Sequence, residues 1–158
     1  MIARRQVIGL AAGALAAAAW PRAARADDGL ARLYPLLIDL PGWASRGPGG
    51  MTTKKLGATM TVAAREYRRG DAFVMAEVAI TQAVWTWRGM LGIKAGRNDP
   101  IGEPEVLKIP FYDTAGLIRV TLAADAQFIL TFKGIPSAEA VALAREFDWK
   151  AIQAALPE

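Results

Sequence analysis

The chain has 158 residues, 53% of them hydrophobic, with nineteen basic and fifteen acidic side chains. It contains neither cysteine nor histidine, which excludes disulfides, Ser-His-Asp and Cys-His nucleophiles, and the usual zinc, copper and haem ligands. Catalysis would have to depend on carboxylates, lysine, tyrosine or a serine and lysine pair, and we expect no cofactor and no metal.

Residues 1–26 have the pattern of an export signal. Arg4 and Arg5 precede a weakly hydrophobic stretch of alanine and glycine at residues 7–19, which is the order that a signal peptide requires. This stretch is too short to cross a hydrocarbon core of about 30 Å as an anchored helix. We therefore expect no stable membrane span.

Ala24 and Ala26 supply a small-x-small cleavage pattern, which leaves residues 27–158 as one mature domain. The arginine pair resembles that of twin-arginine signals, whose substrates cross the membrane folded, and a general secretory signal is the alternative. Both predict a soluble periplasmic protein that meets a translocase, the twin-arginine translocase on the first reading, and a signal peptidase.

The mature domain is formally neutral. Four of the nineteen basic residues lie in the signal, whereas all fifteen acidic residues lie at or after Asp27. A neutral domain has no net field to attract polyanions. Nucleic-acid binding is therefore disfavoured.

Two segments are predicted at the start of the mature chain. Apolar residues recur every three or four positions across residues 29–40, which indicates one face of a short helix. The following residues 45–50 contain three glycines and a proline, which indicates a flexible loop with residues 47–50 as a linker or mobile lid. The apolar face consists of Leu30, Leu33, Tyr34, Leu37 and Ile38.

Two β-hairpins are predicted from alternating apolar residues and turn signals. The first pairs residues 58–67 with 72–81, so that Val74, Ala76, Val78 and Ile80 share a buried face while Phe73, Met75 and Glu77 face the other way. The second pairs residues 117–122 with 126–133.

Helices and one long connection are predicted around these hairpins. Residues 82–91 have a helical pattern, and residues 95–110 are irregular with a short strand at 106–109. Ser137 is the expected N-cap of a further helix, and a last helical turn begins at Asp148. The order predicts an α+β domain with an antiparallel sheet of about four to six strands, built from two hairpins and flanked by helices.

The motif Leu40-Pro41-Gly42-Trp43, the glycine-rich loop, Ala64-Arg65-Glu66-Tyr67 with Gly70-Asp71, and Phe147-Asp148-Trp149 resemble small exported bacterial proteins of unassigned function. The order of strands and helices is similar to that of PsbP-like domains. This resemblance implies a central antiparallel sheet, an accessory or binding role, and no catalytic residues.

Aromatic residues are the first candidates for a binding site. Trp43 adjoins the glycine-rich loop, and Trp85 and Trp87 are too close in sequence to share one helix face. Together with Arg88 they could form a platform for a ligand or partner, because tryptophan offers a large contact area. The alternative is that these rings pack in the core.

Polar residues give two more candidates. Arg65 and Tyr67 share one strand face, expected beside Glu77 or a neighbour of it across the hairpin, and could bind an anion or small polar ligand, or belong to a solvated face. Asp99, Glu103 and Glu105 could offer oxygen ligands to a cation, but their spacing matches no calcium loop and a solvated loop is the alternative.

These observations favour a periplasmic, non-enzymatic domain that binds a small molecule or a protein partner on its sheet face or beside the Trp85 helix. One alternative is a small hydrolase or isomerase that uses a carboxylate with Tyr67 and Arg65. The other is a subunit of a larger periplasmic complex, with an exposed apolar patch around Trp85 or Trp43.

Overall fold

A computed structural model describes residues 28–55, 58–83, 100–109 and 112–157. Six strands in this part of the chain form one antiparallel sheet in the order β1-β2-β3-β6-β5-β4. The α+β prediction is thus confirmed in its coarse form, with a sheet at the upper limit of the expected size and short helices. The strands are β1 Ala44–Lys55, β2 Ala58–Arg69, β3 Ala72–Ala83, β4 Glu105–Lys108, β5 Ala115–Ala123 and β6 Ala126–Lys133.

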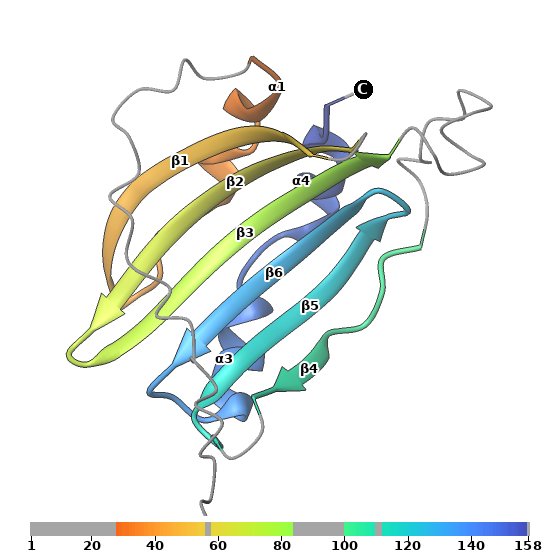
Figure 1. The fold of residues 1–158 in the computed structure, drawn as a ribbon. Helices are drawn as coiled ribbons and strands as arrows, with labels where there is room; N and C mark the ends of the chain where they lie inside the picture. The colour runs from red at the N-terminus through yellow and green to blue at the C-terminus, as the bar shows by residue number, and fades with distance from the viewer. Residues whose placement is uncertain (1–27, 56–57, 84–99, 110–111, 158) are drawn as a thin grey trace, which may run out of the picture.

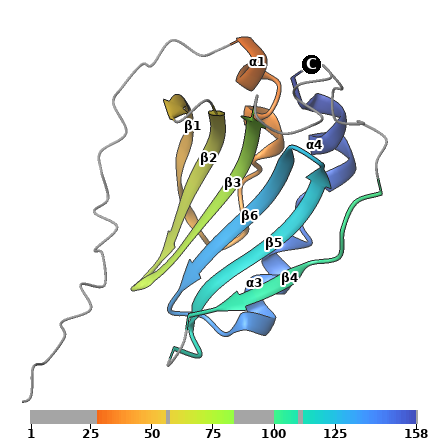
Figure 2. The same cartoon turned by 45° about the vertical axis from the view of Figure 1, so that its right-hand side comes forward.

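The described helices all lie against one face of this sheet, behind it in the view of Figure 1 and again when the molecule is turned in Figure 2. They are α1 Asp28–Ala31, the 3-10 helix η1 Tyr34–Leu36, α3 Ser137–Ala144 and α4 Trp149–Ala155. None of them is long and apolar enough to span a bilayer. We call the sheet face beneath these helices the covered face, and the opposite one the open face.

The hydrophobic core lies between the covered face and the helices. Alternate residues of β3, β5 and β6 point into it, as the period of two in a strand requires. Burying these side chains is the main favourable term in folding. Those with almost no exposed surface are Val74, Ala76, Val78, Ile80, Ile118, Val120, Leu122, Phe128, Leu130 and Phe132.

Both predicted hairpins are confirmed: β6 has the predicted bounds, and β2, β3 and β5 are longer than expected. Gly70 and Asp71 connect β2 to β3, and Gly70 has φ of 58°, which side chains other than glycine rarely adopt. In the second hairpin, β5 and β6 pair from Ala115–Lys133 to Ala123–Ala126. The two hairpins meet through β3 and β6, where Val78 pairs with Phe128.

The predicted flexible loop at residues 45–50 is wrong, because these residues belong to the edge strand β1. The pairing register shifts between Arg46 and Gly49, where Gly47 and Pro48 lie. Proline cannot donate to a ladder but is tolerated at an edge or a bulge. Glycines and a proline therefore form a bulged edge strand here, not a linker or lid.

The single helix predicted over residues 29–40 is also corrected. The chain forms α1 and η1 instead, because Pro35 lacks the amide hydrogen that would continue the helix to the carbonyl of Ala31. The predicted apolar face still packs inward: Leu30, Leu33 and Leu37 are buried, and Tyr34 and Ile38 pack against the core.

The remaining helices and the short strand confirm some of the predicted boundaries and differ from others. The N-cap of α3 is Pro136 and not Ser137, whose buried hydroxyl has no partner among the described residues. Asp148 does cap α4, accepting a hydrogen bond from Ala151 N at 3.0 Å. The short strand expected at 106–109 is β4, displaced by one residue.

The helix predicted at residues 82–91 is wrong at its start, because Gln82 and Ala83 end β3. Its remainder lies outside the described residues, as do residues 95–99 and 110 of the long connection. The described part of that connection is irregular at residues 100–104, before β4.

Gly50 offers a test of how the N-terminal segment packs on β1. A Cβ there would lie 2.5 Å from Leu30 Cδ1 and 2.6 Å from Tyr34 Oη. We expect Gly50→Ala to lower the free energy of unfolding by about 1–3 kcal/mol through overpacking. The control is Gly47→Ala, where a Cβ meets nothing within 4 Å. Equal urea midpoints for the two variants would contradict this packing.

Candidate functional site

Arg65 and Tyr67 share a strand face as predicted, but it is the covered face. Their pairing partners on β3 are Ala76 and Val74, whereas Glu77 pairs with Ala64 on the opposite face. Of the two expected arrangements, the one with Glu77 beside them is therefore wrong, and their neighbours across the hairpin are Ala76 and Val74. A shift of one residue in a strand moves a side chain from one face to the other.

Arg65 and Tyr67 instead bind the backbone between η1 and β1. Arg65 Nη1 donates to the carbonyl of Leu37 at 2.7 Å, and Tyr67 Oη donates to that of Ile38, also at 2.7 Å. Arg65 also forms an ion pair with Asp39 and a hydrogen bond to Ser45 Oγ at 2.8 Å. These contacts satisfy carbonyls that would otherwise be left without partners beside the core.

Tyr67 is held as a protonated donor. Burial raises the pKa of its hydroxyl well above the ordinary value, the Arg65 guanidinium lowers it, and the Asp39 carboxylate adds a smaller upward contribution. A phenol that stays protonated suits the role of donor to Ile38 and not that of a general base.

Trp43 is buried, with 7% of its surface exposed, and belongs to the core cluster. It ends a turn in which its N–H donates to Leu40 O at 3.1 Å. The Arg69 guanidinium lies 4.4 Å from its ring centroid and also forms an ion pair with Glu139 at 2.5 Å. The ring therefore joins β1 to the core and to the side of α3.

Trp85, Trp87, Arg88 and Asp99 lie outside the described residues. Of the other acidic candidates, Glu103 is exposed, and Glu105 pairs with Arg119 at 2.6 Å. Within the described ranges, no group of three or more acidic side chains is arranged to hold a metal ion.

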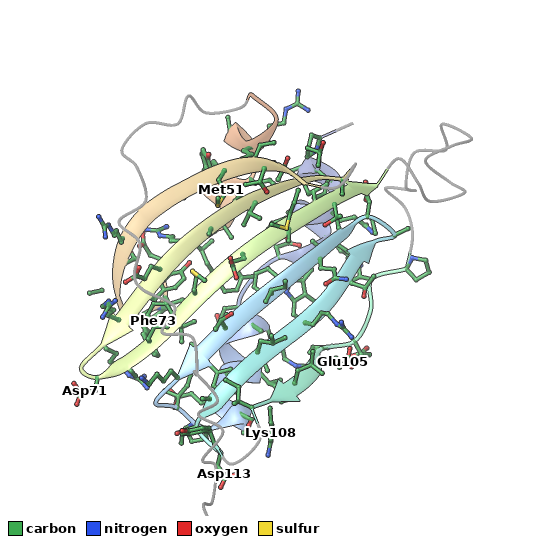
Figure 3. All side chains as sticks on the ribbon, in the orientation of Figure 1. Met51, Asp71, Phe73, Glu105, Lys108 and Asp113 are labelled. Carbon is green, nitrogen blue, oxygen red and sulfur yellow. The ribbon has the colours of Figure 1, made fainter. Side chains whose placement is uncertain are left out.

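The open face presents an apolar surface within a charged border. Figure 3 looks onto this face, with Phe73 and Met51 on its β3 and β1 strands and Glu105 at the β4 edge. Val62 and Ala64 on this face are only 7% and 5% exposed. The register places on this face Met51, Met60, Val62, Ala64, Phe73, Met75, Ala79, Leu117 and Ile129.

Glu77 lies in the middle of the open face. Its lateral neighbours are Ala64 on β2 and Ile129 on β6, and Met75 and Ala79 flank it along β3. Burial among these side chains raises the pKa of its carboxyl above the ordinary value. An acidic group therefore lies at the centre of an apolar surface.

The sequence contained a signal for this site. Phe73, Met75 and Glu77 alternate with the buried residues of β3, which assigned them to the less buried face. The sequence did not show that β3 lies in the interior of the sheet, with β2 on one side and β6 on the other. That placement makes the Glu77 carboxyl central.

Searches against protein-family models, curated proteins and solved structures found no match to this chain. The candidate site is therefore identified from the geometry of the chain alone.

Glu77→Gln tests the desolvation of this carboxyl. A carboxyl with a higher pKa in the folded than in the unfolded chain takes up protons on folding, so stability falls as the pH rises from about 4 through the folded pKa. We expect Glu77→Gln to raise the free energy of unfolding at pH 8 relative to the wild type, with a smaller difference at pH 4.

Urea denaturation at both pH values measures this effect. The matched control is Glu146→Gln, an exposed position after α3. An effect of Glu77→Gln that is constant with pH, or larger at pH 4, would contradict a raised pKa.

Proposed function

We propose that this protein is an exported, periplasmic, non-enzymatic binding or accessory domain that uses the open face of its sheet as the contact surface. Its export rests on the twin-arginine-like signal with Arg4 and Arg5. Its accessory role agrees with the resemblance to PsbP-like domains.

One observation carries the choice of surface: the described helices cover only one face of the sheet, while the centre of the other is apolar. Surface side chains of this kind, bordered by charged residues, mark contact sites for ligands or partners. Arg46, Arg68, Arg119 and Lys133 and the acidic Glu66 and Glu105 form that border.

The enzyme alternative required Arg65, Tyr67 and a shifted carboxylate in one pocket. Arg65 and Tyr67 lie on the covered face and bind backbone carbonyls, whereas Glu77 lies on the open face. The described residues therefore do not bring that set together, and the binding role remains the stronger proposal.

A specific observation favours the complex-subunit alternative at the β4 edge. Large apolar side chains with at least 37% of their surface exposed cluster there and just beyond β4. An edge strand can also accept a strand from another chain. The exposed side chains are Val106, Leu107, Ile109 and Tyr112.

Intact mass under native and denaturing conditions tests the proposal. The protein is purified from the native periplasm as the wild type, as Met75→Lys on the open face, and as Ala142→Lys on the exposed side of α3. We expect the wild type to show a mass excess under native conditions. Met75→Lys should remove this excess because it places a charge in the apolar contact, whereas Ala142→Lys should retain it.

Circular dichroism checks that each variant is folded. A wild-type protein with no mass excess would contradict a tightly held ligand or partner. An excess that survives Met75→Lys but not Val106→Lys would assign the contact to the β4 edge and overturn the choice of the open face.

A further inference from the structure

Glu77 has no hydrogen-bond or ion-pair partner among the described residues, although the polar residues Glu66, Thr131 and Gln127 lie diagonally across from it on β2 and β6. Each lateral neighbour, Ala64 and Ile129, is apolar. A desolvated carboxylate without a partner costs free energy that a bound cation would offset. The centre of the open face therefore has an unused acceptor with a negative charge.

The basic side chains of the open face do not neutralise this carboxylate. Arg119 is two strands away and pairs with Glu105 at 2.6 Å, and Arg68 pairs with Glu66 at 2.7 Å. Lys133 lies four residues beyond Ile129 on β6, about 13 Å along the strand.

Arg46 lies two strands from Glu77, about 10 Å away across the sheet. Glu66, the nearest acidic group, lies diagonally across on β2 and would repel a second carboxylate. The local charge therefore favours a cationic group over an anionic one.

Two small residues lie on the β1 side of the carboxylate, and open space lies over the second of them. In the row of Glu77, Ala64 and Gly49 follow on β2 and β1, and a Cβ added to Gly49 would meet nothing within 4 Å. The apolar frame around Glu77 is about two strand spacings wide, or 10 Å, and about four residues long, or 13 Å. These dimensions suit a compact apolar body.

We propose that the open face binds a small apolar molecule that carries an ammonium group, with the ammonium on the Glu77 carboxylate and the apolar body over Ala64 and Gly49. This inference rests on the proposed function, because it names the ligand class for the same face.

Three probes that share the same apolar cage and differ in the charge of one substituent test the inference. Adamantane-1-ammonium, adamantan-1-ol and adamantane-1-carboxylate are titrated by calorimetry at pH 8 into the protein purified from the periplasm. We expect the ammonium to bind about tenfold more tightly than the alcohol, as a charge-assisted hydrogen bond provides, and the carboxylate to bind most weakly.

Two variants assign the contacts. Glu77→Gln is expected to bring the affinity for the ammonium down to that for the alcohol. Gly49→Leu is expected to weaken all three probes by filling the space beside Ala64, whereas Gly47→Leu, at another position with open space, is the matched control. Thermal unfolding by circular dichroism confirms that each variant is folded.

An ammonium that binds no better than the alcohol, or whose advantage survives Glu77→Gln, would overturn the cation inference. If all three probes bind equally and Gly49→Leu weakens them, the open face remains the binding surface. If none binds, the cation inference fails, and the native mass measurement decides separately whether the face contacts a protein.

Discussion

The structure depends on one constraint: the described helices cover one face of the sheet and not the other (Figure 1). In the described part of the chain, four short helical segments lie on the covered face, while the strands β1, β2 and β3 are each twelve residues long. The core needs only one face of a sheet to be buried against another layer. On the second face Val62 and Ala64 still have little exposed surface, and Glu77 is desolvated by burial.

The covered face depends on its polar contacts as well as on packing. The segment between η1 and β1 lacks regular structure, and two of its carbonyls are satisfied by Arg65 and Tyr67 from β2. The sequence predicted a ligand site at these two residues because polar side chains on alternate positions of a strand have the same pattern whether they bind a ligand or backbone carbonyls. Only the position of the helices distinguishes a backbone anchor from a binding site.

Local sequence patterns predicted the hairpins well, because the alternation of apolar and polar residues and the Gly70-Asp71 turn signal each depend on only a few neighbouring residues. They failed for β1, where Gly47 and Pro48 imitate a loop and only pairing with β2 shows a bulged edge strand. Glu77 illustrates the same limit. Its face followed from alternation, but its central position depends on the pairing of β3 with β6, which joins segments about fifty residues apart.

The central claim is that the open face is accessible in solution, and methionine methyl groups can test it directly. Met51, Met60 and Met75 all lie on that face. In ¹³C-methyl NMR with a neutral nitroxide in the solvent, we predict fast relaxation of the Met51 and Met60 methyls and slow relaxation of the core methyls of Val120 and Ile152. Methionine methyls as protected as those core methyls would show that the face is covered and would contradict its assignment as the contact surface.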